Sequence, residues 1–308
     1  MAVLQQMLIF LCLMLVGIYA RRKGMLTEKN QQQISAITIN IAYPAIILSG
    51  VGNGEKPMSG NELLVSFGTA IFVLVAMVII GKILPRVLGY DKKLFGIVNV
   101  MTVFTNIGFM GVPMIDGIYG KGALIYMTVF LIPFNILFYS YAIQTIQPDT
   151  SARKRFNLKD LCNIGMLSCL LAIVIYFSGI KIPYVLATTI HMIGALTAPL
   201  AMMLIGSSLP DINFRELFTD RRLILFTALK MVIFPAAILI VMKPFIQNEI
   251  LLAVCMAAMA TPSGNMLAML AALYNKDAFL TATKGISLTT AAAVITMPLV
   301  ALLAGIGH

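Results

Sequence analysis

The chain has 308 residues, of which 60% are hydrophobic and only 11% charged, and its mean hydropathy is +0.95. A soluble domain carries about 25% charged residues, so this composition excludes an ordinary soluble protein and indicates an integral membrane protein. The formal net charge of +10 is compatible with nucleic-acid binding, but no nucleic-acid motif accompanies it, and the charge is explained below by membrane topology.

Ten apolar runs follow one another along the chain, each about as long as a helix that crosses a ~30 Å hydrocarbon layer. We therefore predict an all-α polytopic membrane protein with ten transmembrane helices. Numbered 1 to 10, they lie at about residues 3–20, 31–50, 62–84, 94–120, 122–146, 161–179, 184–207, 221–243, 249–274 and 277–305.

Basic residues are unevenly distributed among the predicted loops. Loops after odd-numbered helices contain Arg21, Arg22, Lys23, Lys29, Arg86, Lys92, Lys93, Arg153, Lys154, Arg155, Lys159, Arg215, Arg221, Arg222 and Lys276, whereas loops after even-numbered helices contain Lys56, Lys121, Lys181 and Lys243. Because Lys and Arg are enriched in cytoplasmic loops, the odd loops are predicted to be cytoplasmic. Both termini then face outward, and we expect a multi-pass protein of the plasma (inner) membrane.

A polar segment, residues 147–160, separates two groups of five predicted helices. Adding 155 to a position in the first group often gives the same residue in the second: Gly24 and Gly179, Pro44 and Pro199, Tyr119 and Tyr274, Lys121 and Lys276, and Ala123 and Ala278. Because five is odd, the second group enters the membrane from the opposite side. We predict a first repeat (1–146), a cytoplasmic linker (147–160) and an inverted second repeat (161–308), an arrangement typical of secondary transporters.

Predicted helices 4 and 9 each contain residues that interrupt a helix. Helix 4 contains TNIGFMGVPMIDGIYG (105–120), and helix 9 contains ATPSGNMLAMLAALY (260–274). Non-helical backbone at this depth is tolerated where it lines a cavity or is buried in protein. The half-helix after each break directs free N–H groups and a positive dipole end toward mid-membrane. The pattern predicts a site for a small anion, with a carboxylate favoured.

The expected substrate contacts lie in these breaks and on helix 5: Asn106, Gly108, Gly111, Pro113, Pro262, Ser263, Gly264, Asn265 and Asn135. Asp116 and Lys284 are candidates for ion coupling or for a second charge contact, although an Asp near the start of a half-helix also complements its dipole. Asn135 also suits a hydrogen bond to a neighbouring helix. Lys230, inside helix 8, is expected to extend toward the cytoplasmic interface.

Four motifs resemble the auxin efflux carrier family: YPAIIL (43–48), TNIGFMGVPMIDGIYG (105–120), APLAMMLIGSSL (198–209) and ATPSGNMLAMLAALY (260–274). That family includes plant auxin exporters and bacterial permeases for malate- or malonate-type acids. The resemblance implies a sodium/proton-antiporter-like fold with helices 4 and 9 crossing. Helices 1, 2, 6 and 7 would form a dimerising scaffold, and helices 3–5 and 8–10 an elevator-type transport domain. It further implies that Asn106 contacts the substrate carboxylate.

The sequence therefore predicts a secondary transporter for small organic anions rather than an enzyme. The long central cytoplasmic loop of many plant members is absent, which favours a prokaryotic-type carrier. The expected partners are the anion, the lipid bilayer and a second copy of the chain; no cofactor, metal or nucleic acid is expected. Three alternatives stay open: a sodium-coupled carrier of the bile-acid-symporter type, an anion channel or facilitator, and a membrane receptor or assembly subunit that binds without flux.

Overall fold

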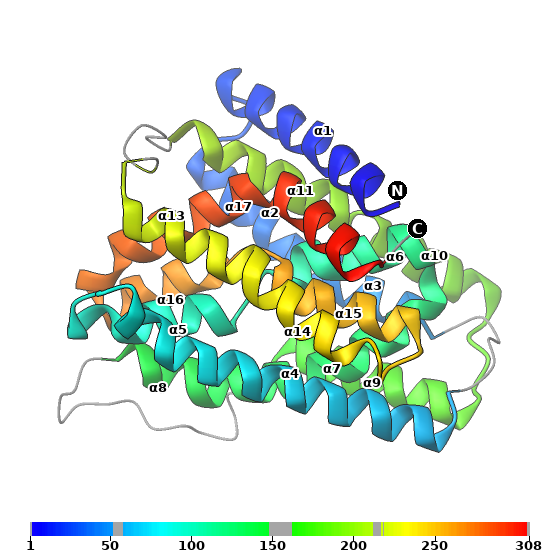
Figure 1. Cartoon of the computed structure of the whole chain (residues 1–308). Helices are drawn as coiled ribbons and strands as arrows, with labels where there is room; N and C mark the ends of the chain where they lie inside the picture. The colour runs from blue at the N-terminus through cyan, green and yellow to red at the C-terminus, as the bar shows by residue number, and fades with distance from the viewer. Residues whose placement is uncertain (1, 52–57, 148–161, 212–216, 218, 307–308) are drawn as a thin grey trace.

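The computed structural model describes residues 2–51, 58–147, 162–211, 217 and 219–306, and the regular elements in these ranges are helical (Figure 1). In chain order they include α1 (Ala2–Arg22), α2 (Glu28–Ile37), η1 (Thr38–Ala42), α3 (Tyr43–Ser49), α4 (Gly60–Val87), η2 (Lys92–Leu94), α5 (Phe95–Val103), η3 (Ile107–Gly111), α6 (Val112–Tyr119), η4 (Lys121–Ala123), α7 (Leu124–Leu137), η5 (Phe138–Ala142), α8 (Ile143–Ile146), α9 (Ile164–Ser178), α10 (Tyr184–Ala195), α11 (Thr197–Ser208), η7 (Leu209–Asp211), α13 (Arg221–Ala228), η8 (Leu229–Ile233), α14 (Phe234–Met242), α15 (Glu249–Ala260), α16 (Met266–Tyr274) and α17 (Lys276–Ala304).

Six continuous helical stretches in the described residues are long and apolar enough to cross a membrane. They are Ala2–Arg22, Gly60–Val87, Lys121–Ile146, Tyr184–Ser208, Arg221–Met242 and Lys276–Ala304. Three shorter apolar stretches accompany them: Ile107–Tyr119, Ile164–Ser178 and Glu249–Ala260. The prediction of an all-helical polytopic membrane protein is thus supported, while the number of ten spans and the inverted repeat stay predictions. The predicted linker, apart from Gln147, lies outside the described residues.

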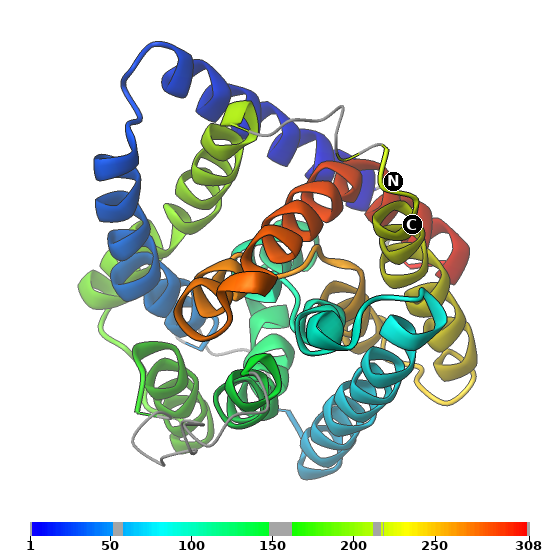
Figure 2. The ribbon, with the colours of Figure 1, turned by 90° about the vertical axis from the view of Figure 1, so that its left-hand side faces the viewer.

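The helices form two groups, each assembled from both halves of the chain. In the first group, α1 packs along α11, and α3 packs against α9 and α10. In the second group, α4 packs on α5 and α7, while α17 packs on α13, α14 and α16. Figure 2 shows α1 and α2 in blue beside α11 in lime at one side, with α17 in orange and red passing through the middle. The two groups meet where α7 contacts α9 and where η3, which follows the first break, contacts α11.

Three prolines follow π-helical turns, at places where the helical backbone continues through the proline. Pro44, Pro113 and Pro235 each come two residues after such a turn, at η1, η3 and η8 respectively. Proline cannot donate to the carbonyl four residues earlier, and a π-helical turn shifts the neighbouring hydrogen bonds by one residue. In each case the residue that directly follows the turn donates its N–H to the first carbonyl of the turn. The widened turns redirect the side chains that they contain.

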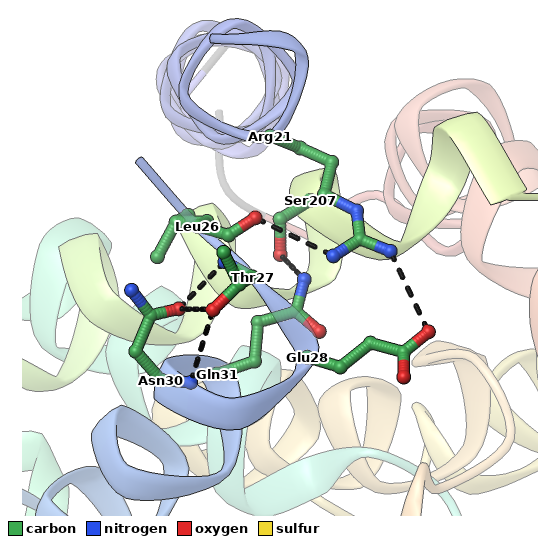
Figure 3. A network of polar contacts seen from close by, with 7 residues as sticks. All are labelled: Arg21, Leu26, Thr27, Glu28, Asn30, Gln31 and Ser207. Carbon is green, nitrogen blue, oxygen red and sulfur yellow. Dashed lines mark hydrogen bonds and ion pairs between the residues drawn. The ribbon is translucent and has the colours of Figure 1, made fainter. Parts of the chain in front are cut away.

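A polar network fixes the turn between α1 and α2 against α11 (Figure 3). Thr27 begins α2 in a capping box, in which its N–H donates to Asn30 Oδ1 at 2.6 Å and its hydroxyl accepts from the Asn30 N–H at 3.5 Å. One turn later, Gln31 Nε2 donates to Ser207 Oγ at 2.7 Å. Because η1 and α3 continue directly from α2, this anchor also positions the Tyr43 region beside the helix breaks.

We expect Gly206→Val to lower the thermal unfolding midpoint of the protein in detergent. A Cβ on Gly206 would overlap the Met14 carbonyl, and one on Gly17 would overlap the Met203 carbonyl, so α1 and α11 approach closely at both glycines. Overpacking of this kind costs about 1–3 kcal/mol. Gly68→Val in α4 is the matched control, because nothing lies within 4 Å of its Cβ position. Equal midpoints for the two variants would contradict the close approach.

Candidate functional site

The first break lies between α5 and η3. Helix α5 ends at Val103, Phe104 is extended, and helical backbone resumes at Ile107 after Asn106. The sequence predicted the interruption within this stretch from Asn106, Gly108, Gly111 and Pro113. The structure instead places Pro113 at the start of α6, two residues after the π-helical turn η3, with helical backbone already present before it. The interruption itself is thus upstream of the proline.

The second break lies between α15 and α16. Helix α15 ends at Ala260, and α16 begins at Met266, so the segment between them is the predicted one. Pro262 cannot donate a hydrogen bond, which prevents α15 from continuing through it. Each of the two helices that follow a break begins directly after an asparagine, Asn106 for η3 and Asn265 for α16, and neither side chain caps its own helix.

The two breaks lie side by side and pair through their backbones. Thr105 and Ser263 form an isolated antiparallel bridge. The Asn106 N–H donates to the Pro262 carbonyl at 2.7 Å, and the Thr105 hydroxyl donates to the Ala258 carbonyl at 2.7 Å. Backbone groups that have left a helix inside a membrane need partners in the protein. The two breaks supply partners to each other, although they are about 155 residues apart in sequence.

Close backbone approach between the breaks favours a glycine. The Gly264 N–H donates to the Phe104 carbonyl at 2.9 Å. A Cβ on Gly264 would lie 3.3 Å from the Thr105 oxygen and 3.4 Å from the Phe104 oxygen. The Ser263 hydroxyl donates to the Met101 carbonyl at 2.8 Å, which attaches the second break to the end of α5. Backbone and side-chain hydrogen bonds therefore both hold the second break against the end of α5 and the first break.

A cavity of about 420 Å³ adjoins the paired breaks. Its walls come from both breaks, from α7 and η5, from η1 and α3, and from the start of α9. The lining residues are Ile39, Asn40, Tyr43, Phe104, Thr105, Asn106, Ile107, Gly108, Phe109, Leu131, Phe134, Asn135, Phe138, Tyr139, Asn163, Ile164, Gly165, Gly264, Asn265 and Met266. Aromatic and aliphatic side chains dominate this lining, and none of its described residues is of a charged type.

The aromatic side chains of the cavity contact one another. The Phe104 ring meets the rings of Phe134 and Phe138 edge to face, with centroids 5.6 and 5.2 Å apart. The Tyr43 and Phe109 rings, which also line the cavity, meet in the same manner at 6.3 Å. Edge-to-face pairs hold rings in fixed orientations. The cavity therefore has a rigid apolar wall beside its polar breaks.

Two buried amide groups at the cavity lack partners among the described residues. They are the Nδ2 atoms of Asn106, which is 4% exposed, and Asn135. Most buried polar groups in proteins are hydrogen-bonded, and a donor left without a partner costs about 1–3 kcal/mol. Both residues line the same cavity, and a turn of either amide group toward it would offer its donors to a bound acceptor.

The structure brings together only part of the predicted contact set. Asn106, Gly108, Asn135, Gly264 and Asn265 line the cavity. The remaining predicted contacts lie next to it, in the breaks or at the start of α6, without forming its wall: Gly111, Pro113, Pro262 and Ser263. These residues shape the backbone rather than face the cavity.

Three charged residues considered from the sequence lie away from this cavity. Asp116 in α6 and Lys284 in α17 are half-buried and absent from its lining. The expectation that Lys230 extends to the cytoplasmic interface is wrong. Its side chain is 1% exposed, and its ammonium donates to the Thr261 carbonyl at the end of α15. The π-helical turn η8, which contains Lys230, directs it inward.

Sequence reasoning missed the contribution of α3 and α9 to the cavity. Tyr43 opens the YPAIIL motif, which carried the family resemblance but had no site role. Asn163 caps α9, accepting from the Met166 N–H at 3.0 Å, and Asn40 lies in η1. An asparagine directly before an apolar run is a recognisable capping signal, but nothing in it indicates which helices meet.

The helical architecture and the apolar helix surfaces define a polytopic membrane protein. The family model described as membrane transport protein, that of the auxin efflux carrier family, matches residues 2–157 and 149–301. The chain therefore belongs to this family of membrane transporters.

Similar proteins carry names that agree with this membership. An uncharacterized transporter of Methanocaldococcus jannaschii is 27% identical, over 66% of this chain and 67% of its own length. The uncharacterized transporter YfdV of Escherichia coli K12 is 22% identical, over 93% of each chain. The family is one of transporters and not of enzymes, and transport is the function that these comparisons support.

Proposed function

We propose that the protein is a secondary transporter that moves small organic anions across the membrane by an elevator-type alternating-access mechanism. The substrate binds in the cavity where predicted helices 4 and 9 cross. One observation carries the proposal: the unpartnered amide groups of Asn106 and Asn135 lie at a cavity beside paired helix breaks. Membership of a transporter family supports the same conclusion.

Neutral donors and helix starts favour a carboxylate as the bound group. Asn106 and Asn265 each precede a helix that begins at the cavity. Helix N-termini carry partial positive charge and free N–H groups, which suit an anion. Inside a membrane protein these interactions are stronger than in water, because the effective dielectric constant is lower.

The remainder of the lining favours a monocarboxylate with an apolar body. Aromatic rings of Phe104, Phe134 and Phe138 form one wall, and no Lys, Arg or His stands among the described lining residues. A second carboxylate would lose its hydration among these rings without a cationic partner, which is costly. Diacids of the malate or malonate type are therefore poorer substrates in this proposal.

An elevator mechanism fits the position of the cavity between the two helix groups. Residues of η1, α3 and α9 belong to the proposed scaffold (predicted helices 1, 2, 6 and 7), whereas the breaks, α7 and η5 belong to the proposed transport domain (helices 3–5 and 8–10). Substrate held at this boundary moves with the transport domain. The proposal includes the inverted repeat, the homodimer through the scaffold and the plasma-membrane location with both termini outside.

Counterflow in proteoliposomes tests the proposed function. Purified protein is reconstituted with internal phenylacetate, and uptake of external labelled phenylacetate is measured with benzoate, hexanoate, malonate or malate as competitors. We expect saturable counterflow, with the monocarboxylates competing at concentrations at least about tenfold lower than the diacids. Flux without saturation or counterflow would favour a channel or facilitator. Counterflow that requires Na⁺ would favour a carrier of the bile-acid-symporter type, and an absence of flux and binding would overturn the proposal.

A further inference from the structure

Lys230 is a buried cation that does not line the proposed substrate cavity. It lies in η8, between α13 and α14, and is 1% exposed. An ammonium has three donors, and among the described residues its one hydrogen-bond acceptor is the Thr261 carbonyl. No carboxylate of the described residues forms an ion pair with it. A charge buried in this manner is costly, so its environment has to compensate for it.

Part of the compensation comes from the end of α15. Thr261 directly follows the last residue of α15 and is fully buried. The carboxyl end of a helix carries partial negative charge, which favours a cation there. One helix end supplies only about half of an elementary charge, so the ammonium still lacks a full counter-charge.

Acidic side chains on the surrounding helices do not supply it. Helices α13 and α14 contain no acidic residue. On α15, Glu249 precedes Ala260 by eleven residues, or about 17 Å of helix. On α17, Asp277 precedes Thr289, which contacts the second break, by about 18 Å. Lys284 lies closer to Thr289 along α17 than Asp277 does, but a lysine cannot supply a negative charge.

The second break connects Lys230 to the cavity. Pro262, the residue after Thr261, accepts the hydrogen bond from the Asn106 N–H, and Gly264 lines the cavity. Three residues of extended chain span at most about 11 Å, so the Thr261 carbonyl and the cavity wall are close together. Lys230 is not part of that wall, but its ammonium binds the Thr261 carbonyl at the start of the break that contributes to the wall.

We propose that Lys230 is the built-in counter-charge of the transported anion, an inference that rests on the proposed function. The cavity offers the carboxylate neutral donors, and Lys230, held at the second break outside the cavity wall, offers the full positive charge. Each charge lowers the cost of burying the other. A loaded transport domain then carries the anion without a co-transported Na⁺, because the chain itself supplies the cation.

The inference predicts a charge-specific effect on binding. A unit charge about 10 Å away, at an effective dielectric constant of about 20, changes an equilibrium constant on the order of tenfold. We expect Lys230→Gln to weaken phenylacetate binding about tenfold and to leave binding of the neutral phenylacetamide unchanged. Glutamine keeps a donor for the Thr261 carbonyl, so the variant removes the charge and retains the hydrogen bond. Lys230→Arg, which retains the charge, is expected to stay within about threefold of the wild type.

Lys243→Gln is the matched control. Lys243 follows α14, on the same predicted helix, and donates to the Ala304 carbonyl at 2.9 Å, but it is exposed. Dissociation constants are measured by isothermal titration calorimetry on the full-length purified protein, with thermal unfolding of each variant recorded without ligand. Phenylacetate binding by Lys243→Gln should equal that of the wild type.

The outcomes separate this inference from the proposed function. Wild-type protein that fails to bind phenylacetate overturns the monocarboxylate proposal, and the counter-charge with it. Wild-type binding with no change in Lys230→Gln, or with equal losses for phenylacetate and phenylacetamide, overturns the counter-charge alone. A charge-specific loss in Lys284→Gln instead would assign the counter-charge to α17. Counterflow that stops when Na⁺ is replaced by N-methylglucamine would also overturn the inference, because the cation would then come from solution.

Discussion

Asn106→Ala is expected to weaken phenylacetate binding by about 10- to 100-fold. A hydrogen bond to a charged group contributes about 1.5–3 kcal/mol, and each 1.4 kcal/mol is a factor of ten in affinity. The folded protein should tolerate the change, because the Asn106 Nδ2 has no partner among the described residues and the backbone bond to Pro262 is retained. Calorimetric titration of the purified variant, together with counterflow in proteoliposomes, measures the effect.

Asn135→Ala provides the comparison for this variant. Asn135 also carries an unpartnered Nδ2 at the cavity, but it lies within α7 and not at a helix start. It therefore lacks the dipole that adds to the Asn106 contact, and we expect a smaller loss of affinity. If Asn106→Ala binds and transports with wild-type affinity and rate, the substrate does not bind at the crossing of the breaks, and the unpaired amide has only a structural role.

The second break was predictable to the residue, whereas the first was not. Pro262 and its polar neighbours interrupt an apolar run by local chemistry alone, and the helix ends there. In the first break, Asn106, Gly108, Gly111 and Pro113 suggested the position, but α5 ends upstream of all four, at Val103. The difference has a tertiary cause: Phe104 is extended where its carbonyl accepts from Gly264 of the other break. Local sequence cannot specify a hydrogen bond to a segment so distant in the chain.

The position of a side chain around a helix was harder to predict than the helix itself. The apolar run at residues 221–243 correctly indicated a helical stretch, but regular helical spacing gives no indication of a π-helical turn. That turn contains Lys230 and directs it toward Thr261. Similarly, Tyr43 and Asn163 reach the cavity because α3 packs against α9. Periodicity identifies an apolar face, but the identity of the neighbouring helix depends on the whole fold.

Gly108→Leu is expected to abolish counterflow, with a loss of at least about 100-fold in the apparent affinity for phenylacetate. A Cβ at Gly108 would lie 3.3 Å from the Tyr43 ring, and both residues line the cavity. A contact of this length allows a methyl group if the ring shifts slightly, so Gly108→Ala should lose only a small part of the activity. The leucine side chain exceeds that room and occupies the space of the substrate between the first break and α3.

A second substitution distinguishes a blocked site from a misfolded protein. Tyr43→Ala removes the ring that opposes Gly108, so the double variant Gly108→Leu with Tyr43→Ala should recover part of the counterflow that Gly108→Leu loses. Thermal unfolding in detergent should give similar midpoints for Gly108→Ala and Gly108→Leu, because the added atoms enter a cavity and not a packed core. Gly108→Leu with wild-type counterflow would mean that the substrate does not pass between the break and Tyr43. A lowered midpoint without recovery in the double variant would indicate that Gly108 is required for the fold of η3 alone.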